Sequence, residues 1–552
     1  MNVSATEPDL VLRAPAPTGR WPGTIVARQT ARKAVRSGAL WGAIFALYVA
    51  ESALGYVSLY KTAAQRAHLA ATFGSSGAAS ALIGPAHQIQ TVAGFTAWRS
   101  LGVLSVVGAV WGLLTGTKLL RGEEEAGRWE LLLAGQTTRS GAGAQALVGL
   151  VAGVAALWTF PALVGVLVGR SSKFDIAAGA ALFLALALVS SAVVFLAVGA
   201  LASQLAATRR QAAAYAGTAL GVSYLMRMVA DSGTGLDWLR WLTPLGWVEE
   251  LQPLTAPHPL ALLPIAGLTA VFAGLAVFLA GARDLGARTL PDRGSTQPHT
   301  RLLSGPAGLT LRLVRPMALG WVAAIAGMAV VFGLIAKSAK GAFSSGLRQE
   351  FSRLGAPGTG ADAYLGVGFL IGAVLVALVA AGQISALRAE EAEGRLDHLL
   401  VRPVARWSWL TGRLGVAIAV IVVSGMVAGV CAWLGAASQH AGVSFASVLE
   451  AGFNIAPPAI CVLGIGILVL GVWPRATSVA IYGVLAWSFL VEFIGGIVGL
   501  NHWVLDTSVF HQMASAPAVA PNWSVGAVLV AIGATTALLG GVAFGRRDLA
   551  GE

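Results

Sequence analysis

Two stretches of the sequence carry carboxylates, arginines and leucines in the same order, 267 residues apart. The first reads RGEEEAGRWELLLAGQTTR over 121–139, and the second reads RAEEAEGRLDHLLVRPVAR over 388–406. Read as a helix, each copy places a glutamate four residues before an arginine, which is the favourable order for an exposed ion pair. These pairs are Glu124 with Arg128 and Glu391 with Arg395. The chemistry that this spacing offers is ion pairing at a surface.

Each copy also carries apolar residues at i, i+3 and i+4, which predicts an apolar stripe beside the charged face of a short helix. Because both copies lie between very long apolar runs, we expect these helices at a membrane surface. A single copy would favour a solvated loop whose charges only set topology, but two copies in one register favour docking to a partner. The residues are Glu123, Glu124, Gly127, Arg128, Trp129, Glu130, Leu132 and Leu133 in the first copy, and Glu390, Glu391, Gly394, Arg395, Leu396, Asp397, Leu399 and Leu400 in the second.

The composition indicates an all-α integral membrane protein. Of the 552 residues, 56% are hydrophobic and 11% are charged, and the mean hydropathy is +0.74. A soluble domain typically has about 25% charged residues. The apolar segments reach roughly 20 residues, enough to cross the membrane as helices, and the alternating pattern of a barrel strand is missing. Cys431 and Cys461 fall inside predicted spans, so no disulfide framework is expected.

The net charge of +12 does not indicate a nucleic-acid partner, because the basic residues form no contiguous face. Most Lys and Arg residues fall on one membrane side when the N-terminus is placed inside. We therefore expect a multi-pass protein of the cell membrane with cytoplasmic N- and C-termini, whose basic residues face anionic membrane lipids. The duplicated segments are then cytoplasmic as well.

The apolar runs predict twelve transmembrane helices in two parallel six-helix repeats, related by a pseudo-two-fold axis along the membrane normal. The predicted units are a tail and interfacial helix (1–37), a first repeat (38–285), a linker with a second interfacial helix (286–316) and a second repeat (317–552). The predicted spans are 38–60, 99–120, 142–168, 176–202, 211–230 and 260–282, and then 317–337, 363–387, 411–437, 449–472, 478–499 and 523–545.

Catalytic motifs are missing from the sequence. It contains no GxxxxGK[ST] phosphate loop, no HExxH and no GxSxG, and its eight histidines show no metal-ligand spacing. We therefore predict no enzymatic activity, no catalytic residue, no metal site and no cofactor in this chain. Two alternative functions stay open. The first is an ion-gradient-driven secondary transporter, for which Glu51 is the candidate ion-binding residue. The second is a polytopic membrane enzyme that acts on lipid-linked substrates.

The repeated pattern E-E-x-x-G-R-x-[ED]-x-L-L, after the second span of each half, resembles the ABC-2-type permeases of ATP-binding-cassette exporters, and the fused form resembles multidrug or polyketide-antibiotic exporter permeases. The resemblance implies connecting helices at 22–37 and about 302–315, and coupling helices at about 123–133 and 390–400. It also implies two copies of a separate ATPase, which binds ATP and Mg, and a hydrophobic or amphipathic substrate such as a drug, antibiotic or lipid. The dipeptides Gly135-Gln136 and Arg402-Pro403 differ between the copies, so the two ATPase contacts are expected to be unequal.

Under the same resemblance, the fifth and eleventh spans line the transport pathway. Candidate substrate-contacting residues are Tyr215, Tyr224, Phe489 and Phe493, although ordinary packing is the more common role of such aromatic residues. Arg227 and Glu492 occupy equivalent positions of these two spans. Because charges inside a span need a partner or water, two arrangements are expected. Either the two side chains pair across the axis and close the outer end of the pathway, or Arg227 extends to the headgroups while Glu492 reaches water.

Overall fold

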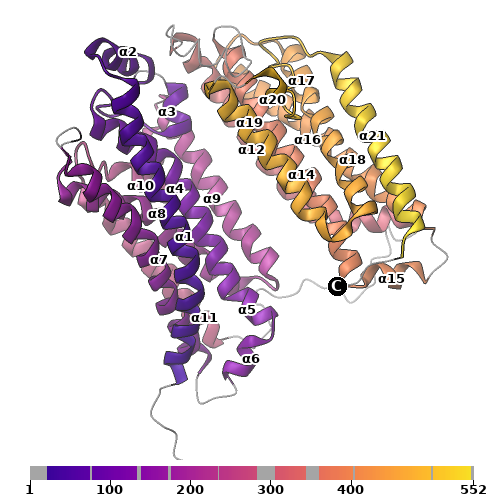
Figure 1. Cartoon of the computed structure of the whole chain (residues 1–552), viewed down its shortest axis with the longest axis horizontal. Helices are drawn as coiled ribbons and strands as arrows, with labels where there is room; N and C mark the ends of the chain where they lie inside the picture. The colour runs from indigo at the N-terminus through magenta and orange to yellow at the C-terminus, as the bar shows by residue number, and fades with distance from the viewer. Residues whose placement is uncertain are drawn as a thin grey trace, which may run out of the picture.

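The computed structural model describes residues 22–74, 77–133, 138–171, 174, 176–233, 235–282, 305–342, 360–401, 405–498 and 501–548. Within these residues, every regular element is a helix. The helices form two bundles that stand side by side, one from each half of the chain (Figure 1).

The first bundle contains long helices joined by short ones. Its elements are α1 (Pro22–Leu59), α2 (Ala63–Phe73), α3 (Gly77–Ile83), α4 (Val92–Leu119), α5 (Arg121–Glu125), α6 (Arg128–Leu133), α7 (Arg139–Gly169), α8 (Ala178–Leu205), α9 (Arg209–Asp231), η1 (Asp237–Leu242), α10 (Pro244–Glu250), η2 (Pro259–Ala261) and α11 (Leu262–Ala282).

The second bundle follows the same plan. Its elements are α12 (Pro306–Ala342), α14 (Ala361–Ala392), α15 (Arg395–Leu400), α16 (Arg406–Ser438), α17 (Phe445–Asn454), α18 (Ala456–Val472), η3 (Pro474–Ala476), α19 (Thr477–Val498), α20 (His502–Leu505) and α21 (Trp523–Arg546).

In the described part of the chain, eleven helices are long and apolar enough to cross a membrane, and each coincides with a predicted span. The range predicted for the fifth span, 211–230, is also helical as α9. Helix α9 is not among the eleven; it carries Arg209 and Arg210 at its start and Arg227 and Asp231 near its end.

Threonine caps fix where several of these helices begin. The hydroxyl oxygens of Thr91, Thr138 and Thr208 each accept a hydrogen bond from the third backbone N–H of the helix that follows, namely α4, α7 and α9. Such a cap satisfies one of the N–H groups that the first helical turn leaves unpaired, and typically contributes about 1 kcal/mol.

Small residues allow the long helices to pack closely. A Cβ atom added to Gly38 of α1 would lie 2.1 Å from the carbonyl oxygen of Gly153 in α7. A Cβ atom added to Gly464 of α18 would lie 2.0 Å from the carbonyl oxygen of Gly533 in α21. In membranes, where helix association gains little from the hydrophobic effect, such close backbone contact supplies the packing energy.

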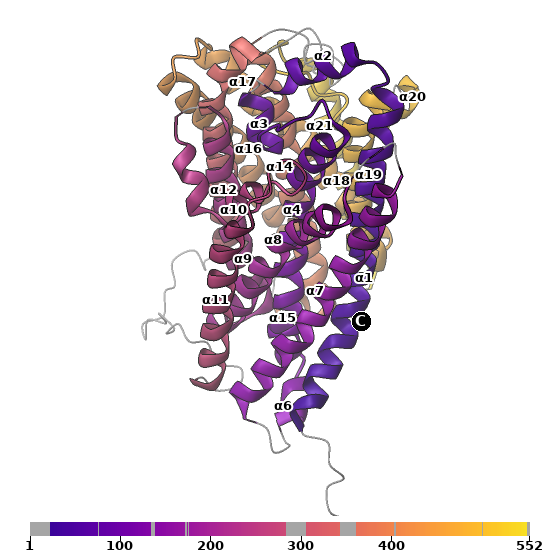
Figure 2. The same cartoon turned by 90° about the vertical axis from the view of Figure 1, so that its left-hand side faces the viewer.

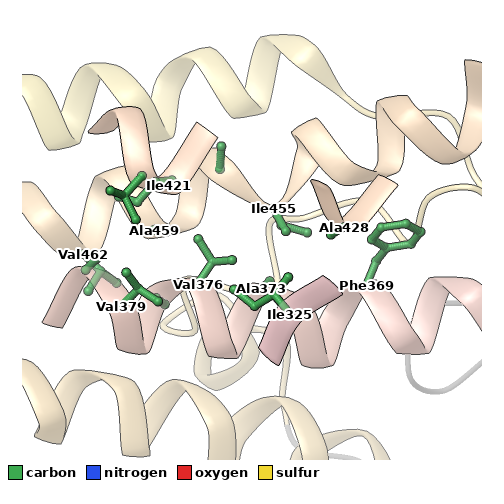
Figure 3. Packing of buried hydrophobic residues seen from close by; sticks show 14 of the residues in the cluster. Ile325, Phe369, Ala373, Val376, Val379, Ile421, Ala428, Ile455, Ala459 and Val462 are labelled. Atoms are coloured by element: carbon green, nitrogen blue, oxygen red, sulfur yellow. The ribbon is translucent and has the colours of Figure 1, made fainter. Parts of the chain in front are cut away.

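Equivalent helices have equivalent neighbours in the two halves. Helix α1 packs along α7 as α12 packs along α16, and α4 packs on α8 as α14 packs on α18. Helix α8 contacts α11 as α18 contacts α21. The buried core of the second bundle lies between α14, α16 and α18, where Phe369, Val376, Ile421, Ile455 and Val462 come together (Figure 3).

The two halves meet through α3, α9 and α12, which contact one another. Ala81 of α3 and Met228 of α9 belong to the same buried cluster as Ile325 of α12. The short helix α3 therefore lies between a long helix of its own half and one of the other half.

The interfacial helices expected at 22–37 and 302–315 are not separate elements. Residues 22–37 are the first part of α1, which runs unbroken for 38 residues. Residues 306–315 are likewise the first part of α12, a helix of 37 residues, whereas residues 302–304 lie outside the described residues. At 1.5 Å per residue, α1 is about 57 Å long, well beyond the ~30 Å hydrocarbon core, so its basic first turns extend out of the membrane.

Candidate functional site

The two duplicated segments lie at the same end of the molecule. Helices α5 and α6 extend below the first bundle, and α15 lies below the second, while α2 and α17 mark the opposite end (Figures 1 and 2). The start of α1 and the end of α21 also lie at the end that carries the duplicated segments.

The first copy is two short helices rather than one continuous helix. Helix α5 ends at Glu125, and α6 begins at Arg128 after Gly127, whose φ is +70°. An added Cβ at Gly127 would meet no atom within 4 Å, so only the left-handed backbone conformation calls for glycine here. The predicted pair of Glu124 with Arg128 is therefore wrong, since the turn at Gly127 separates them.

Glu124 instead belongs to a buried anchor. Its carboxylate pairs with Arg121 Nη1 at 3.0 Å, and the Arg121 side chain is only 2% exposed. Arg121 Nε also donates to the carbonyl oxygen of Ala207, in the turn between α8 and α9, at 3.0 Å. The Arg209 backbone N–H donates to Glu125 Oε1 at 2.6 Å. These contacts fix α5 against the start of α9.

Arg128 forms its ion pair with Glu123. Arg128 Nε lies 2.6 Å from Glu123 Oε2, and Lys33 Nζ of α1 lies 2.7 Å from the same oxygen. The hydrogen bond with Glu123 raises the pKa of the exposed Arg128 guanidinium. One carboxylate thus connects α6 to the part of α1 that extends out of the membrane.

The second copy repeats the turn. Helix α14 ends at Ala392, Gly394 has φ +68°, and α15 begins at Arg395. Arg395 pairs with Glu393 at 2.6 Å, so the predicted pair of Glu391 with Arg395 is also wrong. Each copy therefore contains a glycine turn and an exposed arginine that pairs with a carboxylate lying before that turn.

The buried carboxylate of the second copy has stronger partners than its counterpart. Glu391 Oε2 accepts from Arg547 Nη2, beyond the end of α21, at 2.8 Å. Arg388 lies 3.8 Å from Glu391, in the same i, i+3 relation as Arg121 and Glu124. The Glu391 side chain is 2% exposed. Glu390 pairs with Arg413 of α16. Lys33, Arg413 and Arg547 lie outside the duplicated segments, so the residue spacing within those segments does not predict these partners.

The exposed face of both copies is the same. Arg128 and Glu130 of α6 are exposed, and so are their counterparts Arg395 and Asp397 of α15. The apolar stripe points the other way, since Trp129 and Leu133 pack against the first core and Leu396 and Leu399 against the second. The side chains of Leu132 and Leu400 lie outside the described residues, as do Gly135-Gln136 and Arg402-Pro403. We name this duplicated face, Arg128, Glu130, Arg395 and Asp397, the paired charged face.

Arg227 and Glu492 do not pair with each other in this structure. Arg227 is fully buried and donates to Glu249 Oε1 of α10 at 2.6 Å and to the carbonyl oxygen of Leu82 at 3.0 Å. Glu492 lies 3.4 Å from His511 Nδ1. Each of these charges thus pairs within its own half, with a residue that the repeat alignment does not bring to it.

The aromatic candidates have different surroundings. Tyr224 is partly buried where α3, α9 and α12 meet, and its hydroxyl donates to the carbonyl oxygen of Leu82 at 3.2 Å. Tyr215 and Phe489 are exposed on α9 and α19. The side chain of Phe493 lies outside the described residues.

The structure also shows the surroundings of Glu51 and of the two cysteines. Glu51, the candidate ion-binding residue of a secondary transporter, pairs with Arg99 of α4 at 3.1 Å. In the described ranges, no three His, Cys, Asp or Glu residues come together as a metal site would require. Cys431 and Cys461 are free thiols inside α16 and α18.

The fold and the paired charged face define a multi-pass helical membrane protein with matching polar helices at one end of its two halves. Residues 24–252 match the family described as ABC-2 family transporter protein. Residues 303–545 match the C-terminal domain of the multidrug efflux system permease Rv1217c. The multidrug efflux system permease protein Rv1217c of Mycobacterium tuberculosis is 28% identical over 510 residues, which cover 89% of this chain and 88% of that protein.

Both halves of the chain are therefore similar to ABC-2-type and multidrug efflux permeases, which are transporters rather than enzymes. One match lies in each half of the chain, on either side of the linker that precedes α12.

Proposed function

We propose that this chain is the membrane-spanning subunit of an ATP-driven exporter, and that the paired charged face is where a separate ATP-binding-cassette ATPase docks. The observation that carries the proposal is the duplication of one exposed charge pattern. Arg128 and Glu130 recur as Arg395 and Asp397, exposed in both copies at the same end of the molecule. A repeated pattern fits a partner that is itself present twice, so two ATPase copies would dock, one under each half.

The mechanism needs no catalytic residue in this chain. ATP, held with Mg by the partner, would supply the free energy, and α5, α6 and α15 would transmit the movement of the ATPase dimer to the bundles. In the first copy, Lys33 of α1 pairs with Glu123 of α5, and Arg121 of α5 donates to the carbonyl oxygen of Ala207 just before α9. In the second copy, Arg413 of α16 and Arg547 beyond α21 pair with Glu390 and Glu391 at the end of α14, the helix that precedes α15. A movement of α5 would therefore move α1 and α9, and a movement of α15 would reach α16 and α21 through the end of α14.

The substrate class follows from the family and the apolar bundle. We propose that the exporter moves hydrophobic or amphipathic compounds, such as drugs, antibiotics or lipids, out of the cytoplasm or the inner leaflet. The relative from Mycobacterium tuberculosis is described as a permease of a multidrug efflux system, which supports this class. Twelve membrane-spanning helices in two repeats and cytoplasmic termini belong to the same proposal. Tyr215, Tyr224 and Phe489 remain candidate substrate contacts.

Charge reversal on the paired charged face tests the proposal. The full chain is expressed with a candidate ATP-binding-cassette ATPase from the same organism, and the amount of ATPase that co-purifies is measured. The double variant Glu130→Lys, Asp397→Lys should lose most of the ATPase, while Asp237→Lys, an exposed reversal in η1 near the opposite end, should retain it. Equal retention in both variants would reject the docking assignment.

A further inference from the structure

A compact group of buried charges lies at the end of α9 away from the docking helices. Asp231 and Arg227 come from α9, Arg240 from η1, and Glu249 and Glu250 from α10. Arg240 lies 2.7 Å from Asp231 and 3.0 Å from Glu250, and Arg227 lies 2.6 Å from Glu249. The side chains of Arg227 and Asp231 are fully buried, and that of Glu249 is 10% exposed.

The charges in this group do not balance. Three carboxyl groups face two guanidinium groups, so the group carries one excess negative charge when all are ionised. An unpaired buried charge is costly, and a carboxyl group in this position usually takes up a proton instead. The remaining charged or titratable neighbours do not supply a third cation. Tyr224 lies under Arg227, and Asp237 and His258 are exposed. Arg99 on α4 pairs with Glu51.

Two buried oxygen atoms indicate which carboxyl groups of this charge group can take up the proton. Asp231 Oδ2 and Glu249 Oε2 are both buried, and neither has a hydrogen-bond donor. Both carboxyl groups lie against the same guanidinium group, since Arg227 Nε is 3.9 Å from Asp231 Oδ2 and Arg227 Nη1 is 2.6 Å from Glu249 Oε1. Two carboxylate oxygens can form a hydrogen bond only when one of them carries a proton.

A small cavity gives this pair access to water. It has a volume of about 40 Å³ and is lined by His87, Trp98, Arg240, Glu249, Glu250 and Gln252. Roughly 10–15 Å³ of such volume accommodates one water molecule, so a few would fit. The side chains of Arg240 and Glu250 are 21% and 18% exposed, so the cavity wall reaches the surface. Burial and the neighbouring Arg240 lower the pKa of His87, which leaves its ring neutral and able to accept a proton.

We propose that Asp231 and Glu249 form a buried proton-binding site, in which the two carboxyl groups share one proton, and that the bound proton holds α10 against α9. Binding forms one O–H bond on Glu249 and removes one proton from a hydronium ion or water in the cavity, with no change of oxidation state. Burial and the adjacent Asp231 carboxylate raise the pKa of Glu249, against the opposing effect of Arg227.

Arg227 connects the proton-binding site to the boundary between the two halves. Arg227, which pairs with Glu249, also donates to the carbonyl oxygen of Leu82 in α3. Helix α3 contacts α12 of the second half. Loss of the proton leaves two carboxylates side by side and repelling, which loosens α10 from α9 and weakens the position of Arg227 against α3.

Infrared difference spectroscopy of the full chain in lipid nanodiscs tests the site directly. The signal is the C=O stretch of protonated carboxyl groups, recorded while the pH is raised from neutral to alkaline. All proteins compared carry Glu492→Gln, because Glu492 is a second buried carboxyl group beside His511. The reference protein should show a protonated carboxyl at neutral pH. Adding Glu249→Gln should remove that band, whereas the matched change Glu250→Gln should keep it.

A second variant keeps the test decisive if Glu249→Gln does not fold. Asp231→Asn removes the neighbouring negative charge, so the proton affinity of Glu249 should fall at least about tenfold, seen as loss of the band at lower pH. The proposal is overturned if the reference protein has no protonated carboxyl at neutral pH, if the band is unchanged in Glu249→Gln, or if Asp231→Asn does not shift its titration.

Discussion

At the scale of single residues, burial separates carboxylates with a structural role from those available to a partner. Glu124 and Glu391 carry the most symmetric sequence signal, yet their side chains are only 9% and 2% exposed and each pairs with a buried or partly buried arginine. Glu130 and Asp397, which differ in residue type, are the exposed pair. Substitution of Glu124 or Glu391 would therefore disturb folding before it affects docking.

This difference predicts a stability effect. Glu391→Gln leaves Arg547 without its carboxylate partner, and breaking a buried pair in this way costs on the order of 3 kcal/mol. The matched change Glu393→Gln removes an exposed pair with Arg395, whose side chains are more than half exposed, and should cost less than about 1 kcal/mol. Thermal unfolding in detergent distinguishes them, and equal melting temperatures for the two variants would contradict the structural role of Glu391.

The proton site makes a pH-dependent prediction. The pKa of Glu249 is raised in the folded protein, so its contribution to stability is fully present below the unfolded carboxyl pKa, about 4.3. That contribution is lost as the pH rises through the folded pKa. The stability difference between the natural protein and Glu249→Gln, measured by thermal unfolding from acidic to alkaline pH, should therefore decrease as the pH rises. A difference that does not change with pH would argue against the shared proton.

At the scale of elements, the glycine turns set the direction of α6 and α15. Gly127 has φ +70°, and an added Cβ meets no atom within 4 Å, so a substitution there acts on the backbone alone. Gly127→Ala should cost about 1 kcal/mol and re-orient α6, whereas Gly127→Asn should be milder because asparagine adopts the left-handed conformation more easily. ATPase binding by the membrane-inserted variants measures the effect, and equal binding by both would show that the turn does not orient the docking helix.

Hydropathy was sufficient to locate the long helices, because about twenty apolar residues in a row have few alternatives to a membrane span. It was not sufficient for the polar parts. Residues 22–37 read as a separate interfacial helix, but Lys33 pairs with Glu123 and the helix continues without a break into the span. The duplicated segments read as single helices because the i, i+4 pattern was counted through Gly127 and Gly394. A glycine directly before the next helical residue is a helix-end signal and could have revealed both turns.

At the scale of the whole molecule, aligning the two halves does not predict the contacts of the duplicated segments. Corresponding long helices have corresponding neighbours in the two halves, yet the duplicated segments are attached differently. The first copy is held by Lys33, Arg121 and the backbone of Arg209, and the second by Arg413 and Arg547. An alignment of the two halves cannot predict pairs that only one half makes.

The pair expected between Arg227 and Glu492 illustrates the same limit. Alignment placed opposite charges at equivalent positions, but a nearer carboxylate was available to Arg227 on α10 of its own half. A local partner requires no precise approach of two bundles, so it satisfies a buried charge more readily than one across the axis. The charge group around Asp231 and Glu249 arises from this local solution, and the second half has the Glu492–His511 contact instead.

Site-specific photocrosslinking tests the central claim, that a separate ATPase docks on the paired charged face, most directly. A benzophenone amino acid replaces Glu130 or Asp397 in the full chain expressed with the ATPase, and replaces Asp237 in the control. The account predicts a crosslinked product that contains the ATPase from positions 130 and 397 and none from position 237. No product from 130 and 397, or an equal product from 237, would contradict it.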